Sequence, residues 1–580
     1  MGTPRLHLAV LLALIGCDGT IADAPQPGLT GPGIGERSGP IDPEDRAGSL
    51  FPDETQVFLA PRVWRLRDAE YTALVEAAIG GAVAWEDDHL LDANNYHYSG
   101  SQEGLRMPRA NVDTLARMAD RIGAAAREHL PRAYPCLESG DDGCAESAIR
   151  AIMSVLLRGD LRDDQAAMLA RFAHLRSEGL SLLDALVETV QTAAMLPRVV
   201  FRTEGSDAAR MSGVETATAL AYLLWREPPD AALLEAAEDG RLDDGERRAE
   251  VARTMMNDPR FEARFGHFLA EWLGYRFLDG TVKDSDEHPW YTPETVLAMQ
   301  AEIDGFVAEV LRNRNGSFIE LLTSQTGFAP DTLPEAYAGD RMDGERILTR
   351  AGLALMPGVI AARSGELETK PMKRAQLILQ RLFCRELHAP DDVDFGLLPE
   401  VADDATQREK FTPLGEIAGC AGCHQALNPV AFALESYDSA GVYRTMDGVH
   451  PIDPSASMEG TRDPIGAFAS AVELFTRTAT TADAQGCFVE NAFEAIFGIE
   501  PTHCTTSLLP EGMSVAECLQ CANSEGADEE CQAVRRGVRR GADPVLREAF
   551  EAFEASDYDM REVFVAFVRS DYFVQREARP

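Results

Sequence analysis

The sequence lacks the features of several common protein classes. It has no block of lysine and arginine with interleaved aromatic residues, and its 54 Lys+Arg stand against 95 Asp+Glu, a formal net charge of -41. A field of this sign repels phosphate backbones, so we do not expect nucleic acid as a partner. A well-solvated surface accounts for the acidity, which at most favours a basic redox partner.

Motifs for common enzymes and for membrane spans are missing too. The sequence contains no phosphate-binding glycine loop, no nucleophile elbow and no His-Glu-x-x-His pair. Beyond the N-terminus, no apolar run approaches the length that crosses a bilayer. Runs with strand-like alternation are scarce, so the sequence gives little indication of β-structure.

Helical periodicity occupies most of the chain instead. Amphipathic patterns cover residues 65–82 and 149–200, and Ser212 with Glu215 forms a capping box at the start of another helix. A later helix carries an apolar stripe on one face, formed by Phe261, Phe265, Phe268, Leu269 and Trp272. Such a stripe is more often core than a cofactor site. These patterns predict a mainly α fold.

The first 17 residues indicate export. A weakly basic start with Arg5 precedes an apolar run, Leu8 to Ile15, that is too short to span a bilayer. The run ends at Leu14-Ile15-Gly16-Cys17, which resembles the lipobox of bacterial lipoproteins. We expect Cys17 to carry a lipid that anchors the chain in the envelope of a Gram-negative-type bacterium, on the periplasmic face or at the cell surface. The alternative is an ordinary secretory signal with a chance cysteine.

Two cysteines and a histidine form the strongest chemical motif of the chain. Cys420 and Cys423 are three positions apart and His424 follows directly, which is the attachment pattern of a c-type haem. Each thiol adds across one vinyl group of the porphyrin, and His424 becomes the proximal ligand of the iron. We therefore expect one covalent haem c.

Two alternatives to haem remain open. The cysteines could form a disulfide beside a chance histidine, or they could be half of a zinc site. Zinc would need a second ligand pair at similar spacing, and the only such pair, Cys518 and Cys521, has no adjacent histidine.

Export to an oxidising compartment predicts disulfides among the other cysteines. Of the 11 cysteines, three are assigned to lipid and haem, which leaves an even number. Cys136 and Cys144 flank a turn-rich loop and are expected to pair with each other. The pairing of the others stays open, because six cysteines allow many connectivities. These six are Cys384, Cys487, Cys504, Cys518, Cys521 and Cys531.

Composition and motifs together predict a multidomain helical protein with a small cytochrome-c-like haem domain in its C-terminal half. The expected segments are a signal peptide (1–17), a flexible Gly/Pro tether (18–55), helical domains at 56–145 and 146–206, a helical domain with a core around Trp225 and Trp272 (207–345), the haem domain (346–478) and a C-terminal disulfide-bearing helical module (479–580).

Several stretches also resemble a known family. They are residues 226–234, 255–260, 271–273, 420–444, 487–498, 559–564 and 570–573. These stretches are similar to domains of secreted predicted cytochromes from planctomycetes and myxobacteria, which are multidomain proteins of unknown function with a Cys-x-x-Cys-His haem motif. The resemblance covers most of the chain from about residue 60. It implies the architecture and the haem, and it implies no particular activity.

The sequence departs from that family near the haem motif. Asn428-Pro429 stands where members usually carry Asp-Pro, and Ala431 stands where they usually carry glycine. Members also tend to have a histidine at the position of Leu414, before the first haem cysteine. The resemblance therefore supplies no sixth iron ligand.

The chain itself offers candidates for that sixth ligand. Met446 or Met458 would provide a thioether, which raises the reduction potential and favours electron transfer, whereas His450 would give a bis-histidine centre. An open sixth position that admits peroxide or another small ligand is the remaining alternative. We expect Arg444 either to contact the haem propionates or to form a surface ion pair.

The sequence thus favours a lipid-anchored cell-envelope protein with one c-type haem, which transfers electrons or acts on a small oxidant. The alternative is a non-enzymatic surface scaffold or glycan-binding lipoprotein with a structural or vestigial haem site. No residue pattern names a catalytic group, a substrate or a redox partner.

Overall fold

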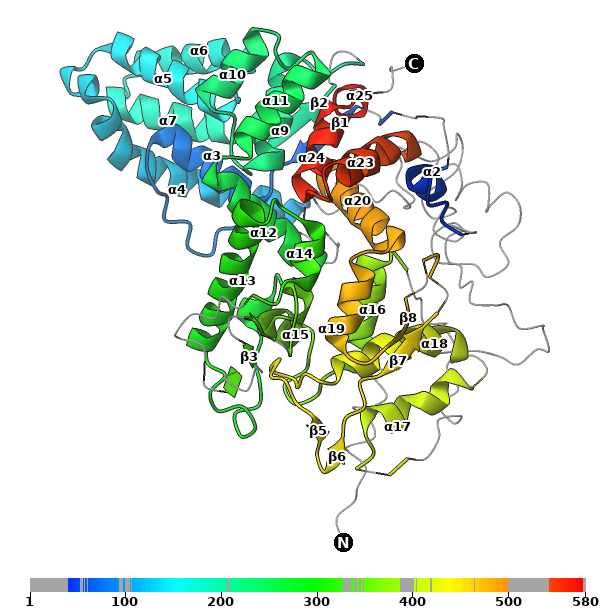
Figure 1. The fold of residues 1–580 in the computed structure, drawn as a ribbon. Helices are drawn as coiled ribbons and strands as arrows, with labels where there is room; N and C mark the ends of the chain where they lie inside the picture. Colours follow the sequence, from blue (N-terminus) through cyan, green and yellow to red (C-terminus); the bar gives the residue numbers. More distant parts are fainter. Residues whose placement is uncertain are drawn as a thin grey trace. The chain divides into compact units, whose positions relative to one another are not determined.

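The computed structural model describes most of the chain (Figure 1). The described residues are 40–52, 56, 58–59, 61–92, 98–99, 105, 107–205, 209–326, 334, 336–337, 342–343, 346–347, 349–385, 401–402, 404–417, 420–459, 461–463, 465–498 and 542–576. Outside them lie the expected signal peptide with Cys17, residues 18–39 of the expected tether, and the segment 499–541 with Cys504, Cys518, Cys521 and Cys531.

The chain divides into two compact units, and each is built from separate stretches of sequence. Unit 1 consists of Met1–Thr55, Gly266–Ala492 and Leu509–Val563, and unit 2 consists of Gln56–Phe265, Phe493–Leu508 and Phe564–Pro580. Helices dominate the described residues of both units, and every strand described belongs to a two-stranded sheet. The prediction of a mainly α, multidomain fold is confirmed. None of the described helices is long and apolar enough to cross a membrane.

Unit 2 contains a bundle of helices and one short sheet. Its elements are β1 (Arg62–Arg65), α3 (Asp68–Ile79), α4 (Arg109–Ala133), η1 (Pro135–Ser139), α5 (Asp142–Leu156), α6 (Asp164–Ser177), α7 (Leu182–Ala194), α8 (Pro197–Val200), β2 (Phe201–Glu204), α9 (Gly213–Leu224), α10 (Ala231–Glu238), α11 (Gly245–Met255) and α25 (Asp571–Val574). The apolar faces of α3, α4, α5 and α7 meet in one core, with Tyr71, Met118, Ile149 and Val190 almost fully buried.

Local sequence signals are confirmed in unit 2. The Ser212 hydroxyl accepts a hydrogen bond from the Glu215 backbone N–H at 3.2 Å, and the Glu215 carboxylate accepts one from the Ser212 backbone N–H at 2.9 Å, so the capping box starts α9. The predicted disulfide between Cys136 and Cys144 joins η1 to α5.

Unit 1 contains most of the other helices and strands. They are α2 (Arg46–Leu50), η2 (Leu278–Gly280), α13 (Pro293–Asn313), α14 (Phe318–Thr323), β3 (Met342–Asp343), β4 (Arg346–Ile347), η4 (Leu353–Leu355), α15 (Pro357–Ala362), α16 (Pro371–Leu382), α17 (Gln407–Phe411), η6 (Thr412–Gly415), α18 (Ala421–Leu434), β5 (Met446–Asp447), β6 (His450–Pro451), β7 (Ala456–Met458), β8 (Gly466–Phe468), α19 (Ala471–Thr478) and α23 (Asp543–Ala555). Three further helices have residues assigned to both units: α12 (Pro259–Trp272), α20 (Ala482–Phe497) and α24 (Met560–Arg569).

The apolar stripe of α12 is buried along its whole length, as its helical spacing predicts. Within unit 1, the Trp272 ring packs edge-on against Phe488 at 5.4 Å and lies 6.2 Å from Phe318, which forms an aromatic core. Trp225 is also buried, but it belongs to unit 2, where its indole N–H donates to the Met255 carbonyl at 3.1 Å. The structure therefore differs from the shared Trp225/Trp272 core expected for residues 207–345, because the boundary between the units falls within α12.

The C-terminal end of the expected tether is folded. In α2, the Arg46 guanidinium bonds to the Glu554 carboxylate of α23 at 2.8 Å, and the Phe51 ring lies 6.3 Å from Phe550. For residues 40–52 the prediction of a flexible tether is wrong. The prediction failed because the Gly- and Pro-rich composition upstream of α2 outweighs the few apolar residues, such as Leu50 and Phe51, that are buried in this segment.

A second disulfide joins Cys384, two residues after the end of α16, to Cys487 in α20 across 103 residues of sequence. Both cysteines belong to the six whose pairing the sequence leaves open. The bridge lies within unit 1, the unit that also contains the haem motif.

Candidate haem-attachment site

Helix α18 carries the haem motif at its N-terminal end (Figure 1). Cys420 is the residue that precedes the helix, and its carbonyl accepts a hydrogen bond from the His424 backbone N–H at 3.0 Å. Because an α-helix has 3.6 residues per turn, Cys420, Cys423 and His424 occupy neighbouring positions of one face. A single helical turn therefore groups the two thiols and the imidazole that haem attachment requires.

Neighbouring elements hold α18 on several sides. Helix α16, the α17–η6 segment, β7 and α19 all pack against it. At its C-terminal end, the buried Arg374 guanidinium of α16 donates to the carbonyls of Leu434, Tyr437 and Asp438, at 3.1, 2.8 and 2.5 Å. These bonds satisfy the last carbonyl of α18 and two carbonyls in the segment that follows it, and they fix the helix against α16.

The imidazole of His424 is enclosed by two side chains. His424 is only 2% exposed, and its Nδ1 lies 3.2 Å from Oδ1 of Asn428, one turn further along the helix. The Phe411 ring from α17 stacks on the imidazole, with centroids 5.9 Å apart and planes 14° apart. The Asn428 amide nitrogen in turn donates to the Phe411 carbonyl at 2.9 Å.

The charge state of this imidazole follows from its burial. Desolvation lowers the pKa of His424 below its ordinary value, and the hydrogen bond that the imidazole donates to Asn428 offsets only part of that effect. This shift favours the neutral form of the His424 imidazole. The neutral imidazole is the form that binds a metal.

The two thiols and the imidazole fit the attachment of a c-type haem. Cys420 is buried and Cys423 is half-buried, and neither forms a disulfide. Across the part of the chain that the structure describes, no group of three or more His, Cys, Asp or Glu side chains could hold a metal ion. A c-type haem needs only the imidazole as an iron ligand from this set, because the thiols bond to the porphyrin.

The candidate sixth ligands occupy different surroundings. Met458 lies in β7, which packs against α18, and it is 2% exposed. Met446 in β5 is 45% exposed, and the His450 imidazole in β6 lies 3.4 Å from the Asp404 carboxylate. Leu414, at the position where members of the family that the sequence resembles tend to carry histidine, is buried in η6. Of the two methionines, Met458 is the buried one and belongs to a strand that packs against α18, and the identity of the ligand stays a prediction.

Arg444 is engaged within the protein. Its guanidinium bonds to the Glu435 carboxylate at 2.8 Å and to Asp447 at 3.0 Å. Burial raises the pKa of Glu435, although the charges of Arg374 and Arg444 and a bond from Thr369 oppose this effect. An ion pair was one of the two predicted roles of Arg444, and its contact with haem propionates stays a prediction.

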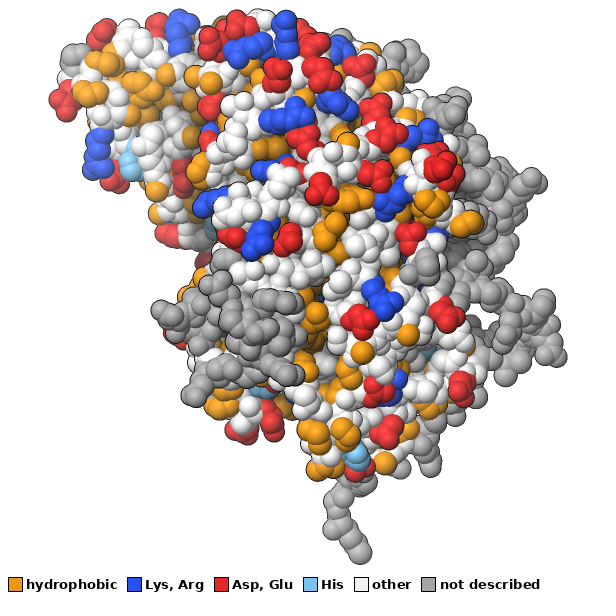
Figure 2. Space-filling view, viewed as in Figure 1, with side chains coloured by type: hydrophobic (Ala, Val, Ile, Leu, Met, Phe, Trp, Pro, Cys, Tyr) orange, Lys and Arg blue, Asp and Glu red, His pale blue; other side chains and the backbone are white. Residues whose placement is uncertain are grey.

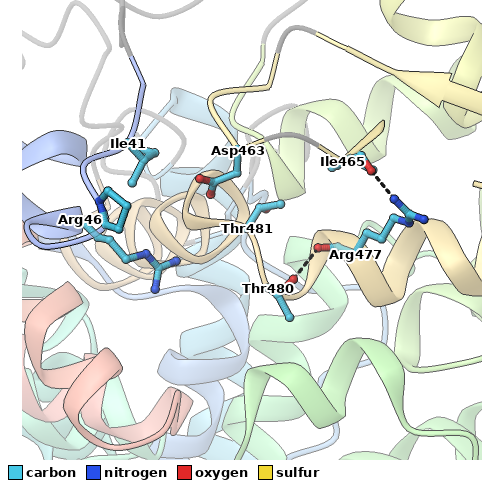
Figure 3. Close-up of a pocket in the computed structure, with 8 residues that line it drawn as sticks. Ile41, Arg46, Asp463, Ile465, Arg477, Thr480 and Thr481 are labelled. Carbon is cyan, nitrogen blue, oxygen red and sulfur yellow. Dashed lines mark hydrogen bonds between the residues drawn. The ribbon is translucent and has the colours of Figure 1, made fainter. Parts of the chain in front are cut away.

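A cavity in unit 1 has a volume of about 360 Å³ and does not involve the motif. It is lined by Ile41, Pro43, Arg46, Asp463, Ile465, Arg477, Thr480 and Thr481 (Figure 3). The two arginines of the lining form hydrogen bonds within the protein: Arg477 donates to the Ile465 carbonyl at 2.6 Å, and Arg46 donates to the Gln485 side chain at 2.6 Å.

On the face of the molecule seen in Figure 2, basic side chains are interspersed with acidic ones.

Two family models match parts of the chain. Residues 211–338 match PSD4, described as a protein of unknown function (DUF1592), and residues 350–447 match PSCyt3, described as a protein of unknown function (DUF1588). Neither match covers half of the chain. The second includes the whole haem motif, Asn428 and Arg444. Both agree with stretches of the cytochrome-family resemblance, and they indicate a cytochrome-like protein without giving it a specific function.

The other two comparisons found no relative. No curated protein and no solved structure matches this chain.

The surroundings of His424 were only partly visible in the sequence. Asn428 stands four residues after His424, a spacing that brings two side chains together on a helix and could have indicated their contact. Phe411 lies 13 residues before His424 on a separate helix, and no local signal points to their stacking.

Proposed function

We propose that this chain is a mono-haem c-type cytochrome-like protein of the cell envelope that transfers electrons. Cys420 and Cys423 would attach the haem, and His424 would be the proximal iron ligand. Bound haem supplies one-electron chemistry between ferric and ferrous iron. The observation that carries the proposal is a buried imidazole beside two thiols on one helical turn, with its Nδ1 bonded to Asn428.

Electron transfer is the favoured chemistry because of Met458. This methionine is buried in a strand that packs against α18, and a thioether ligand favours electron transfer over binding of small oxidants. The net charge of -41 supports a basic redox partner, because opposite charge speeds encounter. The N-terminal motif supports lipid attachment at Cys17 and retention at a membrane.

The proposal is tested by maturing the full chain beside a c-haem assembly system in the bacterial envelope. A pyridine haemochrome spectrum should show haem that survives acid-acetone extraction, and Cys420→Ala with Cys423→Ala should abolish it. The matched control is Cys136→Ser with Cys144→Ser, which also removes two cysteines but leaves α18 intact. Wild-type protein without covalent haem would refute the proposal and would favour a surface scaffold with a vestigial motif.

A further inference from the structure

The amide of Asn428 is held in one orientation by two partners. Its Nδ2 donates to the Phe411 carbonyl at 2.9 Å, and its Oδ1 lies 3.2 Å from Nδ1 of His424. Asn428 is only 7% exposed, so solvent offers little competition for these bonds. If the amide were flipped, Oδ1 would face the Phe411 carbonyl, and two acceptors would meet. The hydrogen bond to the Phe411 carbonyl therefore orients the Asn428 amide so that Oδ1 faces the imidazole.

This orientation fixes the tautomer of His424. The Oδ1 atom of Asn428 can only accept, so Nδ1 of the imidazole must carry the hydrogen. In the neutral tautomer the ring carries a single hydrogen, and Nδ1 holds it. Its Nε2 therefore holds an available lone pair.

The plane of the imidazole is fixed as well. The Phe411 ring stacks on it with only 14° between the planes, and the same residue supplies the carbonyl that holds Asn428. One residue of α17 thus restrains both the ring of His424 and the side chain that bonds to it. The stacking and the hydrogen bond together limit rotation of the His424 imidazole about its Cβ–Cγ bond.

We propose that Asn428 is a positioning residue that presents Nε2 of His424 to the haem iron and helps to set the reduction potential. The inference rests on the proposed function, because it assigns Nε2 as the iron ligand. A bond to Nδ1–H raises the basicity of a ligating imidazole, and a more basic ligand stabilises ferric iron. Because the Asn428 amide is uncharged, this effect is smaller than that of a carboxylate, and the potential stays higher than a carboxylate would allow.

The test compares Asn428→Leu, which keeps the approximate volume but removes both bonds, with the wild-type full chain carrying haem. Loss of a hydrogen bond worth about 1 kcal/mol should speed solvent exchange of the His424 Nδ1 hydrogen about fivefold. The reduction potential should rise, because the ligand becomes less basic. Nuclear magnetic resonance and a redox titration measure the two effects.

Two further variants keep this test decisive. Gln425→Leu is the matched control, because Gln425 is exposed on the same helix and bonds to the Gly415 carbonyl at 3.0 Å without touching His424. It should leave exchange and potential unchanged. Asn428→Ala leaves room for water, and it should reproduce the direction of both effects if the leucine variant does not fold. Wild-type exchange and wild-type potential in Asn428→Ala would overturn the inference.

Failure of the proposed function would be seen differently, as a wild-type chain without covalent haem. The haem-free chain then still tests the role of Asn428, through the ring nitrogen shifts of ¹⁵N-labelled histidine, with His424→Ala to assign the signal. The wild-type ring should carry its hydrogen on Nδ1, and the Asn428 variants should shift toward Nε2–H. A wild-type ring protonated at Nε2, or the same tautomer in all variants, would overturn the inference.

Discussion

Replacing Glu204 by glutamine should strongly destabilise unit 2. Glu204 is 3% exposed at the end of β2, where it stands opposite Arg62 of β1 in the antiparallel register. Its carboxylate accepts hydrogen bonds from Arg62 at 2.5 and 3.2 Å, from Arg202 at 2.8 Å, and from Arg576. Glutamine keeps the size of the side chain and removes its charge, so the buried guanidinium groups lose their counter-charge.

The magnitude follows from the burial of the partners. Arg62 and Arg576 are 4% and 3% exposed, and loss of one member of such a buried pair costs about 3–5 kcal/mol of unfolding free energy. The matched control is Glu146→Gln in α5 of the same unit, which breaks an exposed ion pair with Arg150 at 3.9 Å. An exposed pair of this spacing contributes only about 0.3–0.5 kcal/mol.

The effect should also depend on pH. Burial alone would raise the pKa of Glu204, but the charges of Arg62, Arg576 and Arg202 outweigh burial and hold the pKa well below its ordinary value. A glutamate in the unfolded chain has a pKa of about 4.3. The stabilisation is complete above that pH and is lost as pH falls toward the folded-state pKa. The difference in stability between the wild-type chain and Glu204→Gln should therefore shrink in acid.

The loss of stability in Glu204→Gln can be measured by hydrogen exchange and mass spectrometry, in peptides that cover β1, β2 and α25. At pH 7 the Glu204→Gln variant should exchange at least about a hundredfold faster there, since each 1.36 kcal/mol corresponds to a factor of ten. The Glu146→Gln control should remain close to wild type. If the two variants exchange alike, the reasoning from burial and counter-charge is refuted.

Three further predictions concern the disulfide, the lipid and the sixth ligand. Replacing Cys384 and Cys487 by serine should lower the unfolding free energy of unit 1 by about 2–4 kcal/mol, because the bridge closes a long loop; an unchanged urea midpoint would contradict this. Cys17→Ser should release the protein from membranes in fractionation, since the lipid is the only predicted anchor; full retention would argue against the lipobox. Met458→Ala should lower the potential of the haem-loaded protein, whereas the exposed Met446 should be replaceable by alanine without effect; the reverse result in a redox titration would exclude Met458.

Features encoded within a few residues could be predicted from the sequence. The capping box of Ser212 and Glu215 and the bridge between Cys136 and Cys144 join residues only three and eight positions apart. The buried stripe of α12 follows from helical spacing alone. In each case the partners are close in sequence and have few other residues to pair with. A local pattern is therefore enough to identify the contact.

Features that depend on distant residues could not be predicted. Composition does not show that Phe51 packs against Phe550, and six cysteines allow too many pairings to identify Cys384–Cys487. The stacking of Phe411 on His424 likewise depends on how α17 packs against α18. The motif predicts which residues would attach haem, whereas tertiary packing sets the orientation of the imidazole.

Peptide mass spectrometry of the full chain, matured beside a c-haem assembly system, tests the central claim most directly. Because both proposed thioether bonds would form within one turn of α18, we expect a single haem on the peptide that contains Cys420 and Cys423, and none elsewhere. A peptide without haem, or one with a disulfide between Cys420 and Cys423, would contradict the account.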